Sequence, residues 1–431
     1  MRKKRKKAVC CLLALAMVCS MTGCTTYNNF KAAFFPGSKA EQEQTIKIGI
    51  YEATSGKLSD QGKAEVKGIE LAHDLYGTVL DKKVELVYGD NQSSMYVGET
   101  VIQELISQNP SVILGSCGET VTLMASDYIK AASIPAITIS STNPLITANN
   151  EFYFTATFAE TRQGDALADY AFTGRGKDVV ATVKLSSDDT ATATIKRFTN
   201  RMKKLSENDR CIVGSFELPQ DTGDYTDVIE KIRESGAKAV FLAVPPSTAR
   251  AFLQQAVDQR MTHITWLGGR SWDDEDLLNF VKSQKKLDIA YPSDFSQKVS
   301  TARTEEFVKA YKEKYGEGEE PSEATAVAFD AYLLALQAIE DAQNTVMELT
   351  EEEVRSRYET EATQKAAIAE WKQARETGIP TGRQIKLMLE QIKNFQGASG
   401  IISYNGKNEA AKSITINRIS GGQEQPAYNV E

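Results

Sequence analysis

The segment VGETVIQELISQNPSVILGSCGETVTLMASDYIKAASIPAITIS, residues 97–140, decides the fold class of this chain. Apolar residues recur at helical spacing over 97–108 and again over 120–132. Each of these segments is followed by a short run rich in apolar and β-branched residues, at 111–115 and at 134–140. Short strands that alternate with helices of ten or more residues predict βαβ units and a parallel sheet.

The same alternation extends in both directions and falls into two groups. The first group begins at the strand-like run TIKIGIY, residues 45–51, and the second runs from DVVATVKL at 178–185 to ITWLGG at 264–269. Residues 153–165 separate the two groups. At 431 residues the chain is also too long for one compact core. The sequence therefore predicts an α/β fold with two doubly wound lobes.

The first residues are typical of an export signal. Residues 2–7 are basic, residues 8–21 are apolar but too few to span a membrane comfortably, and the string MTGC then ends at Cys24. MTGC resembles a bacterial lipobox, in which the cysteine becomes the lipid-modified first residue. We expect residues 1–23 to be a lipoprotein signal peptide, Cys24 to carry lipid, and residues 24–44 to tether the protein outside the cytoplasm to the bacterial cell membrane. An ordinary secretory signal is the alternative.

Charge and composition exclude several classes of function. The formal net charge of -8 becomes -14 once residues 1–23, with six basic residues and no acidic one, are removed. Such an acidic chain argues against a nucleic-acid partner, which needs a basic face. Cys117 and Cys211 are far apart, and His73 and His263 are isolated, so the sequence predicts no metal site. Nucleotide-binding and catalytic motifs are missing too, so we expect neither a cofactor nor an enzyme.

Polar residues follow two neighbouring strands of the first group. Glu119 and Thr120 lie in the turn after one strand, and the hydroxyl residues Ser140, Ser141 and Thr142 end the next. Ligands of open α/β sheets bind at the carboxyl ends of the strands, where helix N-termini also present free N–H groups. These five residues are therefore candidate ligand contacts. Ordinary turn and capping chemistry is the alternative.

The second group supplies three further candidates. Asp189 follows a strand and is predicted either to contact ligand or to cap the next helix. Arg270 and Trp272 lie in the turn GGRSWDD. The indole of Trp272 is suited to cover an apolar or cationic part of a ligand, although core packing explains a tryptophan equally well.

The ordered set of segments resembles the periplasmic-binding-protein type I receptors of the leucine/isoleucine/valine-binding group, which feed ABC transporters. The set includes IKIGIY from Ile46, IPAITISSTNP from Ile134, WLGGRSWDD from Trp266 and FQGASGIISYNGKNE from Phe395. The resemblance implies two Rossmann-like lobes joined by three crossings and a small amino-acid-like ligand held between them. It implies an ABC permease as the partner and no catalysis. A receptor that signals to a membrane partner is the alternative function.

The resemblance also implies the domain boundaries. Lobe 1 is expected at 45–157 and 295–398, and lobe 2 at 158–294 and 399–425. A charged helical insertion is expected at about 348–378, where Glu and Lys or Arg recur at i,i+4 and predict a solvated helix.

Two positions depart from the pattern of the group. Ser140 and Thr142 match residues that hold the ligand's zwitterion, but Glu119 stands where the group has a serine for the ligand carboxylate. Arg270 stands where the group has an acid for the ligand ammonium. Three alternatives follow. The ligand binds with reversed polarity, or Glu119 and Arg270 form an ion pair that latches the lobes, or both side chains face water.

Overall fold

The computed structural model describes residues 45–220, 223–298, 301–404, 406, 408–425 and 427–430. The predicted signal peptide, the lipid-modified cysteine and the tether lie outside these residues. No helix in the described ranges is both long enough and apolar enough to cross a membrane.

Lobe 1 is built on a six-stranded sheet with the order β2-β3-β1-β4-β5-β6. All neighbouring strands are parallel except the β2–β3 pair. Strand order reverses around β1, so the carboxyl ends of β1 and β4 form the crevice in which such sheets bind ligands. The strands are β1 (Ile46–Glu52), β2 (Thr78–Val79), β3 (Lys82–Asp90), β4 (Val112–Leu114), β5 (Ala136–Thr138) and β6 (Tyr153–Thr155).

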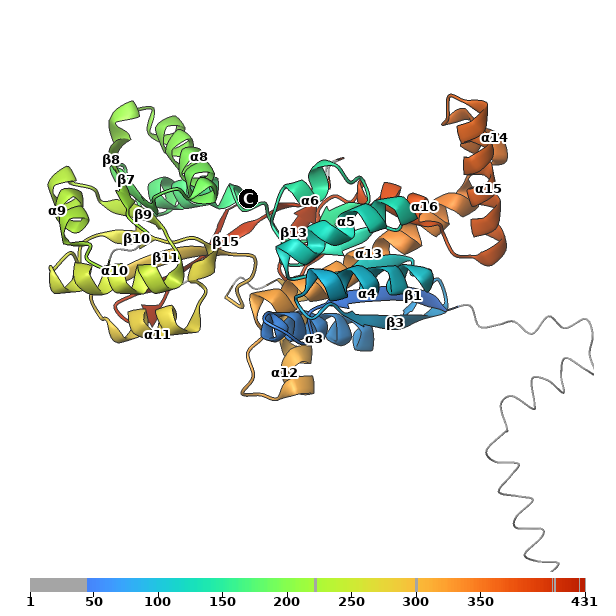
Figure 1. The fold of residues 1–431 in the computed structure, drawn as a ribbon, viewed down its shortest axis with the longest axis horizontal. Helices are drawn as coiled ribbons and strands as arrows, with labels where there is room; N and C mark the ends of the chain where they lie inside the picture. Colours follow the sequence, from blue (N-terminus) through green and yellow to red (C-terminus); the bar gives the residue numbers. More distant parts are fainter. Residues whose placement is uncertain are drawn as a thin grey trace, which may run out of the picture. The chain divides into compact units, whose positions relative to one another are not determined.

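Helices cover both faces of this sheet. Alternate residues of β1 point to opposite faces, so Ile48 and Ile50 pack with α3 and α13, whereas Tyr51 packs with α4 and α5. Figure 1 shows the long helix α13, in orange, returning to lobe 1 late in the chain. The helices are α3 (Ser59–Leu75), α4 (Met95–Ser107), α5 (Glu119–Ala132), α6 (Leu145–Ala148), α12 (Ala302–Tyr315), α13 (Glu323–Glu348) and α16 (Gly382–Leu389).

Lobe 2 contains a second sheet, with the order β16-β15-β11-β10-β9-β7-β8 and β17 paired to β15. Strands β7 to β11 are parallel, and β15 runs antiparallel to β11. The predicted α/β fold with parallel sheets in two lobes is therefore confirmed. The strands are β7 (Val180–Leu185), β8 (Ile212–Leu218), β9 (Ala239–Ala243), β10 (Thr265–Leu267), β11 (Asp288–Ser293), β15 (Ile414–Ser420), β16 (Gln423–Glu424) and β17 (Tyr428–Val430).

The lobe 2 helices also pack on both faces of their sheet. Phe198 of α8 packs with Phe241 on one face, and Phe252 of α10 packs with Trp266 on the other. In Figure 1, α8 and α10 accordingly lie on opposite sides of the strands. The helices are α7 (Arg162–Asp169), continued by a π-helical turn η1 (Tyr170–Gly174), then α8 (Asp189–Ser206), η2 (Asp209–Cys211), α9 (Thr226–Ser235), α10 (Pro246–Asp258), η3 (Arg270–Trp272) and α11 (Glu275–Ser283).

The charged insertion forms two helices, α14 (Glu351–Ser356) and α15 (Glu361–Thr377). Each begins with a capping box, at Thr350 and at Thr360, and the second box starts a new helix where a single one was expected. One side of the insertion is not solvated, because the indole nitrogen of Trp371 donates to the Val346 carbonyl of α13 at 3.0 Å.

Three chain crossings join the lobes and meet at one buried ion pair. The first crossing passes Thr157, the second Asp294 and the third Lys412, close to a small sheet of β12 (Phe395–Gly397), β13 (Gly400–Ser403) and β14 (Ala411–Lys412). The Lys412 ammonium lies 3.0 Å from an Asp294 carboxylate oxygen, and both side chains are 0% exposed. Thr157 also donates to Asp294. Because buried charges need partners, this cluster fixes how the three crossings meet.

The close crossing of α3 and α13 depends on Gly68. A Cβ atom at this position would lie 2.1 Å from the Thr325 carbonyl oxygen and 2.9 Å from the Ala328 Cβ. We expect Gly68→Ala to lower the free energy of unfolding by about 1–3 kcal/mol, because the helices must separate to admit the methyl group. Chemical denaturation measures this loss. Gly318→Ala is the control, since its Cβ would meet nothing within 4 Å, and equal losses in both variants would contradict the argument.

Candidate functional site

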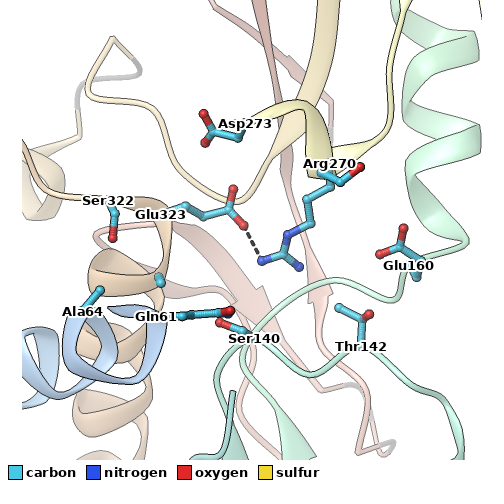
Figure 2. Close-up of a pocket in the computed structure, with 11 residues that line it drawn as sticks. Gln61, Ala64, Ser140, Thr142, Glu160, Arg270, Asp273, Ser322 and Glu323 are labelled. Carbon is cyan, nitrogen blue, oxygen red and sulfur yellow. Dashed lines mark hydrogen bonds and ion pairs between the residues drawn. The ribbon is translucent and has the colours of Figure 1, made fainter. Parts of the chain in front are cut away.

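A cavity of about 520 Å³ lies between residues of the two lobes, at the carboxyl ends of the lobe 1 strands. Lobe 1 supplies α3, the loop after β5 and the start of α13, while lobe 2 supplies η3 with the residue that follows it. Figure 2 shows these side chains converging on one space. The lining residues are Gln61, Ala64, Ser140, Thr142, Glu160, Arg270, Ser271, Asp273, Ser322, Glu323 and Ala324.

Arg270 crosses from lobe 2 to lobe 1. Its Nη2 atom donates to Glu323 at the start of α13 (dashed in Figure 2) and lies 3.1 Å from Asp294 Oδ2. Its Nη1 atom donates to Thr157 Oγ1 at 2.7 Å. The guanidinium carbon also lies 5.4 Å from the centre of the Phe158 ring, within cation–π range. Both terminal nitrogens of Arg270 therefore have protein partners.

The charges around Arg270 stabilise one another. Burial disfavours the charged form of the guanidinium, yet the charges of Glu323 and Asp294 raise the pKa of Arg270 above its ordinary value. Burial acts against the charge of Asp294 as well, but Lys412 and Arg270 hold the pKa of that carboxyl below its ordinary value. Burial instead raises the pKa of Glu323 despite the opposing charge of Arg270. The lowered pKa of Asp294 means that its stabilising contribution is lost only as acid protonates that carboxylate.

The predicted pair of Glu119 and Arg270 does not form in the described structure. The ion-pair partners of Arg270 among the described residues are Glu323 and Asp294. Glu119 is exposed at the first position of α5 and accepts a hydrogen bond from Thr142 at 3.4 Å. Arg270 thus links the two lobes, but its partner in lobe 1 is Glu323, which the sequence did not indicate.

A pair of buried carboxyl groups lies behind the cavity wall. Ser140 donates to Glu65 Oε1 at 2.5 Å, and Gln61 donates to the same oxygen at 3.4 Å. Glu52, at the end of β1, accepts the Cys117 backbone N–H at 3.1 Å. Glu52 and Glu65 are both 0% exposed. Each keeps one carboxyl oxygen without a hydrogen-bond partner among the described residues.

Two neighbouring buried carboxyl groups cannot both ionise readily. Burial, with the nearby charge of Glu65, raises the pKa of Glu52 well above its ordinary value, and burial also raises the pKa of Glu65. The pair therefore holds a proton to higher pH than exposed carboxyl groups do. Sequence analysis did not identify Glu65, although a signal existed. It lies three residues after Gly62 and four before Ile69, on the buried stripe of α3 where apolar residues are expected.

Two further acids line the cavity. Glu160 accepts a hydrogen bond from Gln163, and burial raises the pKa of Glu160 despite the opposing charge of Arg270. Asp273 follows Trp272 and has the Tyr291 hydroxyl at 3.5 Å. Neither Glu160 nor Asp273 forms a salt bridge with another described residue. No periodicity pointed to either residue, because both lie outside regular helices and strands.

The structure brings three of the eight predicted ligand contacts to the cavity: Ser140, Thr142 and Arg270. Ser141 is buried and bonds the Ser116 carbonyl at 3.0 Å, while Thr120 is exposed on α5. Asp189 is exposed at the first turn of α8, whose cap is Asp188.

The fully buried indole of Trp272 donates to the Val244 carbonyl at 3.1 Å. The core-packing interpretation of Trp272 is therefore the one that the structure supports. Among the described residues, no group of three or more His, Cys, Asp or Glu side chains is arranged to hold a metal ion.

Comparisons with known proteins agree with this architecture. A family model described as periplasmic binding protein matches residues 45–388. A Leu/Ile/Val-binding protein homolog 6 from Brucella suis is 24% identical over 53% of this chain, and the alignment covers 58% of that relative.

Solved structures agree as well. The branched-chain amino acid transporter substrate-binding protein from Streptococcus pneumoniae, in complex with isoleucine, has a TM-score of 0.65 and 23% identity, and the match covers 90% of this chain and 99% of that one. A solute-binding protein of an ABC transporter from Rhodopseudomonas palustris, in complex with 3,4-dihydroxybenzoic acid, has a TM-score of 0.62 and 19% identity over 89% of this chain and 97% of that one. At these identities the likeness to solved structures shows the fold alone.

The interaction between Arg270 and Glu323 can be measured by a double-mutant cycle. The two side chains are 17% and 11% exposed, so solvent screens their attraction only weakly. We expect Arg270→Ala, Glu323→Ala and the double variant to give a coupling of about 1–3 kcal/mol in the free energy of unfolding. Arg233 and Glu230, an exposed pair on α9, form the control cycle, with an expected coupling below about 0.5 kcal/mol. Equal couplings in the two cycles would contradict the structure.

Proposed function

Because the chain belongs to the periplasmic binding protein family, we propose that it is a solute receptor that captures a small polar ligand between its lobes and delivers it to an ABC permease. Membership of this family implies a location outside the cytoplasm. The proposed ligand is an amino acid or a related compound. The relatives bind different ligands on one fold, so the fold alone does not name the ligand of this chain.

The observation that carries the proposal is the cavity lined from both lobes. Ser140 and Thr142 come from lobe 1, whereas Arg270 comes from lobe 2. A ligand that contacts all three residues has a higher affinity for the closed arrangement than for one in which the lobes have separated. Binding would therefore shift the molecule toward closure, as a capture-and-delivery receptor requires.

Lipid anchoring is part of the same proposal. A receptor outside the cytoplasm serves a permease best when it stays near the membrane. Cys24 after a basic and an apolar segment supplies the expected attachment point. Two or more acyl chains at one site would satisfy the requirement for stable anchoring, since a single chain binds only marginally.

We propose no enzymatic activity. The acids of the cavity have the perturbed pKa values that catalytic groups often show, but structural ion-pair clusters also produce them. Arg270, Glu323 and Asp294 satisfy one another, and we identify no nucleophile paired with a base among the residues that line the cavity.

Ligand binding should compact the molecule. A thermal-shift screen of amino acids, amides, polyamines and small carboxylic acids identifies a ligand, because a ligand that binds only the folded state raises the unfolding temperature. With that ligand at saturation, small-angle scattering should give a smaller radius of gyration than the free protein gives. Saturating binding without compaction would show that the two lobes do not clamp the ligand.

The anchor is tested separately. We expect mass spectrometry of the mature protein to find Cys24 as the first residue, with its mass increased by acyl chains. Cys24→Ala should abolish this modification and release any exported protein from the membrane fraction. Mature protein that begins after Cys24, or that carries it unmodified, would exclude the lipid anchor without affecting the proposed receptor activity.

A further inference from the structure

The cavity hydroxyls expected to hold the zwitterion of the ligand direct their protons to acids of the protein. Ser140 donates to Glu65 Oε1 at 2.5 Å, and Thr142 donates to Glu119 Oε1 at 3.4 Å. A hydroxyl has one proton and two acceptor lone pairs. Once the proton is directed to a carboxylate of the protein, the oxygen offers the ligand only an acceptor. Ser140 and Thr142 therefore suit a ligand that donates hydrogen bonds.

Arg270, the only basic residue among those that line the cavity, is similarly engaged. Its two terminal nitrogens donate to Thr157 and Glu323, and Asp294 lies at 3.1 Å. A ligand carboxylate at Nη2 would have to compete with Glu323, which also accepts a hydrogen bond from Ser293 at 2.6 Å. The positive charge of Arg270 is thus already neutralised by the protein.

The helix N-termini near the cavity have acids of the protein in their first turns. Glu119 is the first residue of α5, and Glu323 is the first residue of α13. A helix N-terminus favours negative charge, and a carboxylate in the first turn satisfies that preference. A ligand anion placed at either end would be repelled by the resident glutamate.

Two acids then remain to act on a ligand. Glu160 and Asp273 line opposite parts of the wall, one before α7 and one after η3, and no described basic side chain forms a salt bridge with either. In the view of Figure 2, Glu160 lies near Thr142, and Asp273 lies on the other side of the Arg270–Glu323 pair from Ser140. The wall therefore combines two acids that form no salt bridge with a described residue and the Ser140 and Thr142 oxygens, which are left as acceptors.

We propose that the ligand is a small organic cation whose amine or guanidine N–H groups donate to Ser140 and Thr142 and pair with Glu160 and Asp273. This inference rests on the proposed receptor function and names its ligand class. Charge-assisted hydrogen bonds from an ammonium or guanidinium to carboxylates are the strong contacts that such a wall can make. A ligand recognised first through its carboxylate would find the Ser140 hydroxyl proton and the Arg270 Nη2 nitrogen already engaged by glutamates of the protein.

Calorimetric titration of the purified protein tests the ligand class. Agmatine and spermidine are the cationic probes, and isoleucine and 3,4-dihydroxybenzoic acid are the comparison ligands. We expect at least one cation to bind tenfold or more tightly than either comparison ligand, with an affinity that falls as salt rises from 50 to 500 mM. Tighter binding of isoleucine or of the benzoate would overturn the cation inference while leaving the receptor function intact. Failure of every compound in the wider thermal-shift screen would count against the receptor function itself.

Near-isosteric variants locate the contacts. Glu160→Gln and Asp273→Asn each remove a negative charge while keeping the size of the side chain, and each should weaken binding of the cation at least tenfold. Glu104→Gln is the matched control, because this exposed glutamate lies on α4 and does not line the cavity. Unfolding temperatures within a degree or two of the parent would show that the variants remain folded. Unchanged affinity in both cavity variants would place the cation elsewhere and overturn the assignment.

Discussion

The ion pair between Asp294 and Lys412 constrains the rest of the structure. Neither side chain touches water, and each belongs to a different crossing between the lobes. A buried charge without a partner costs several kcal/mol, so the crossings are held where both charges are matched. Arg270 extends the cluster from Asp294 to Glu323, and thereby links the hinge to the cavity wall. The position of the lobe 2 turn that carries Arg270 consequently depends on electrostatics at the hinge as well as on packing.

The side chains of the cavity affect which ligand charge it favours, without any change of fold. The crevice at the carboxyl ends of the strands and the helix N-termini around it follow from the topology, and on their own they favour an anion. In this chain Glu119 and Glu323 occupy the first turns of two such helices. The hydroxyls of Ser140 and Thr142 are turned toward acids. The direction of a few hydrogen bonds and the charges of a few side chains can therefore reverse the preference for an anionic ligand that the backbone sets.

The two parallel sheets and their helices could be predicted from the sequence between Ile46 and Leu267, because strand and helix periodicities are local and repeat many times there. Apart from the charged insertion, the segments after Leu267 were expected only from the family resemblance. The site was predicted only in part. Ser140 and Thr142 could be identified because they follow a strand directly. The partner of Arg270 could not, since Glu323 lies 53 residues further along the chain and no periodicity connects the two. Trp272 has the same local sequence whether it faces ligand or core, and only the packing of lobe 2 decides between these roles.

The carboxyl pair of Glu52 and Glu65 also affects the molecule as a whole. Counting residues assigns each glutamate a full negative charge at neutral pH and gives an isoelectric point of about 5.3. Burial raises the pKa of both carboxyl groups, so this pair holds a proton to higher pH in the folded chain than in the unfolded chain. A carboxyl group whose pKa is raised by folding opposes folding as the pH rises and the group ionises. These two glutamates of lobe 1 therefore cost stability at high pH, whereas a salt-bridged carboxylate such as Asp294 loses its contribution at low pH.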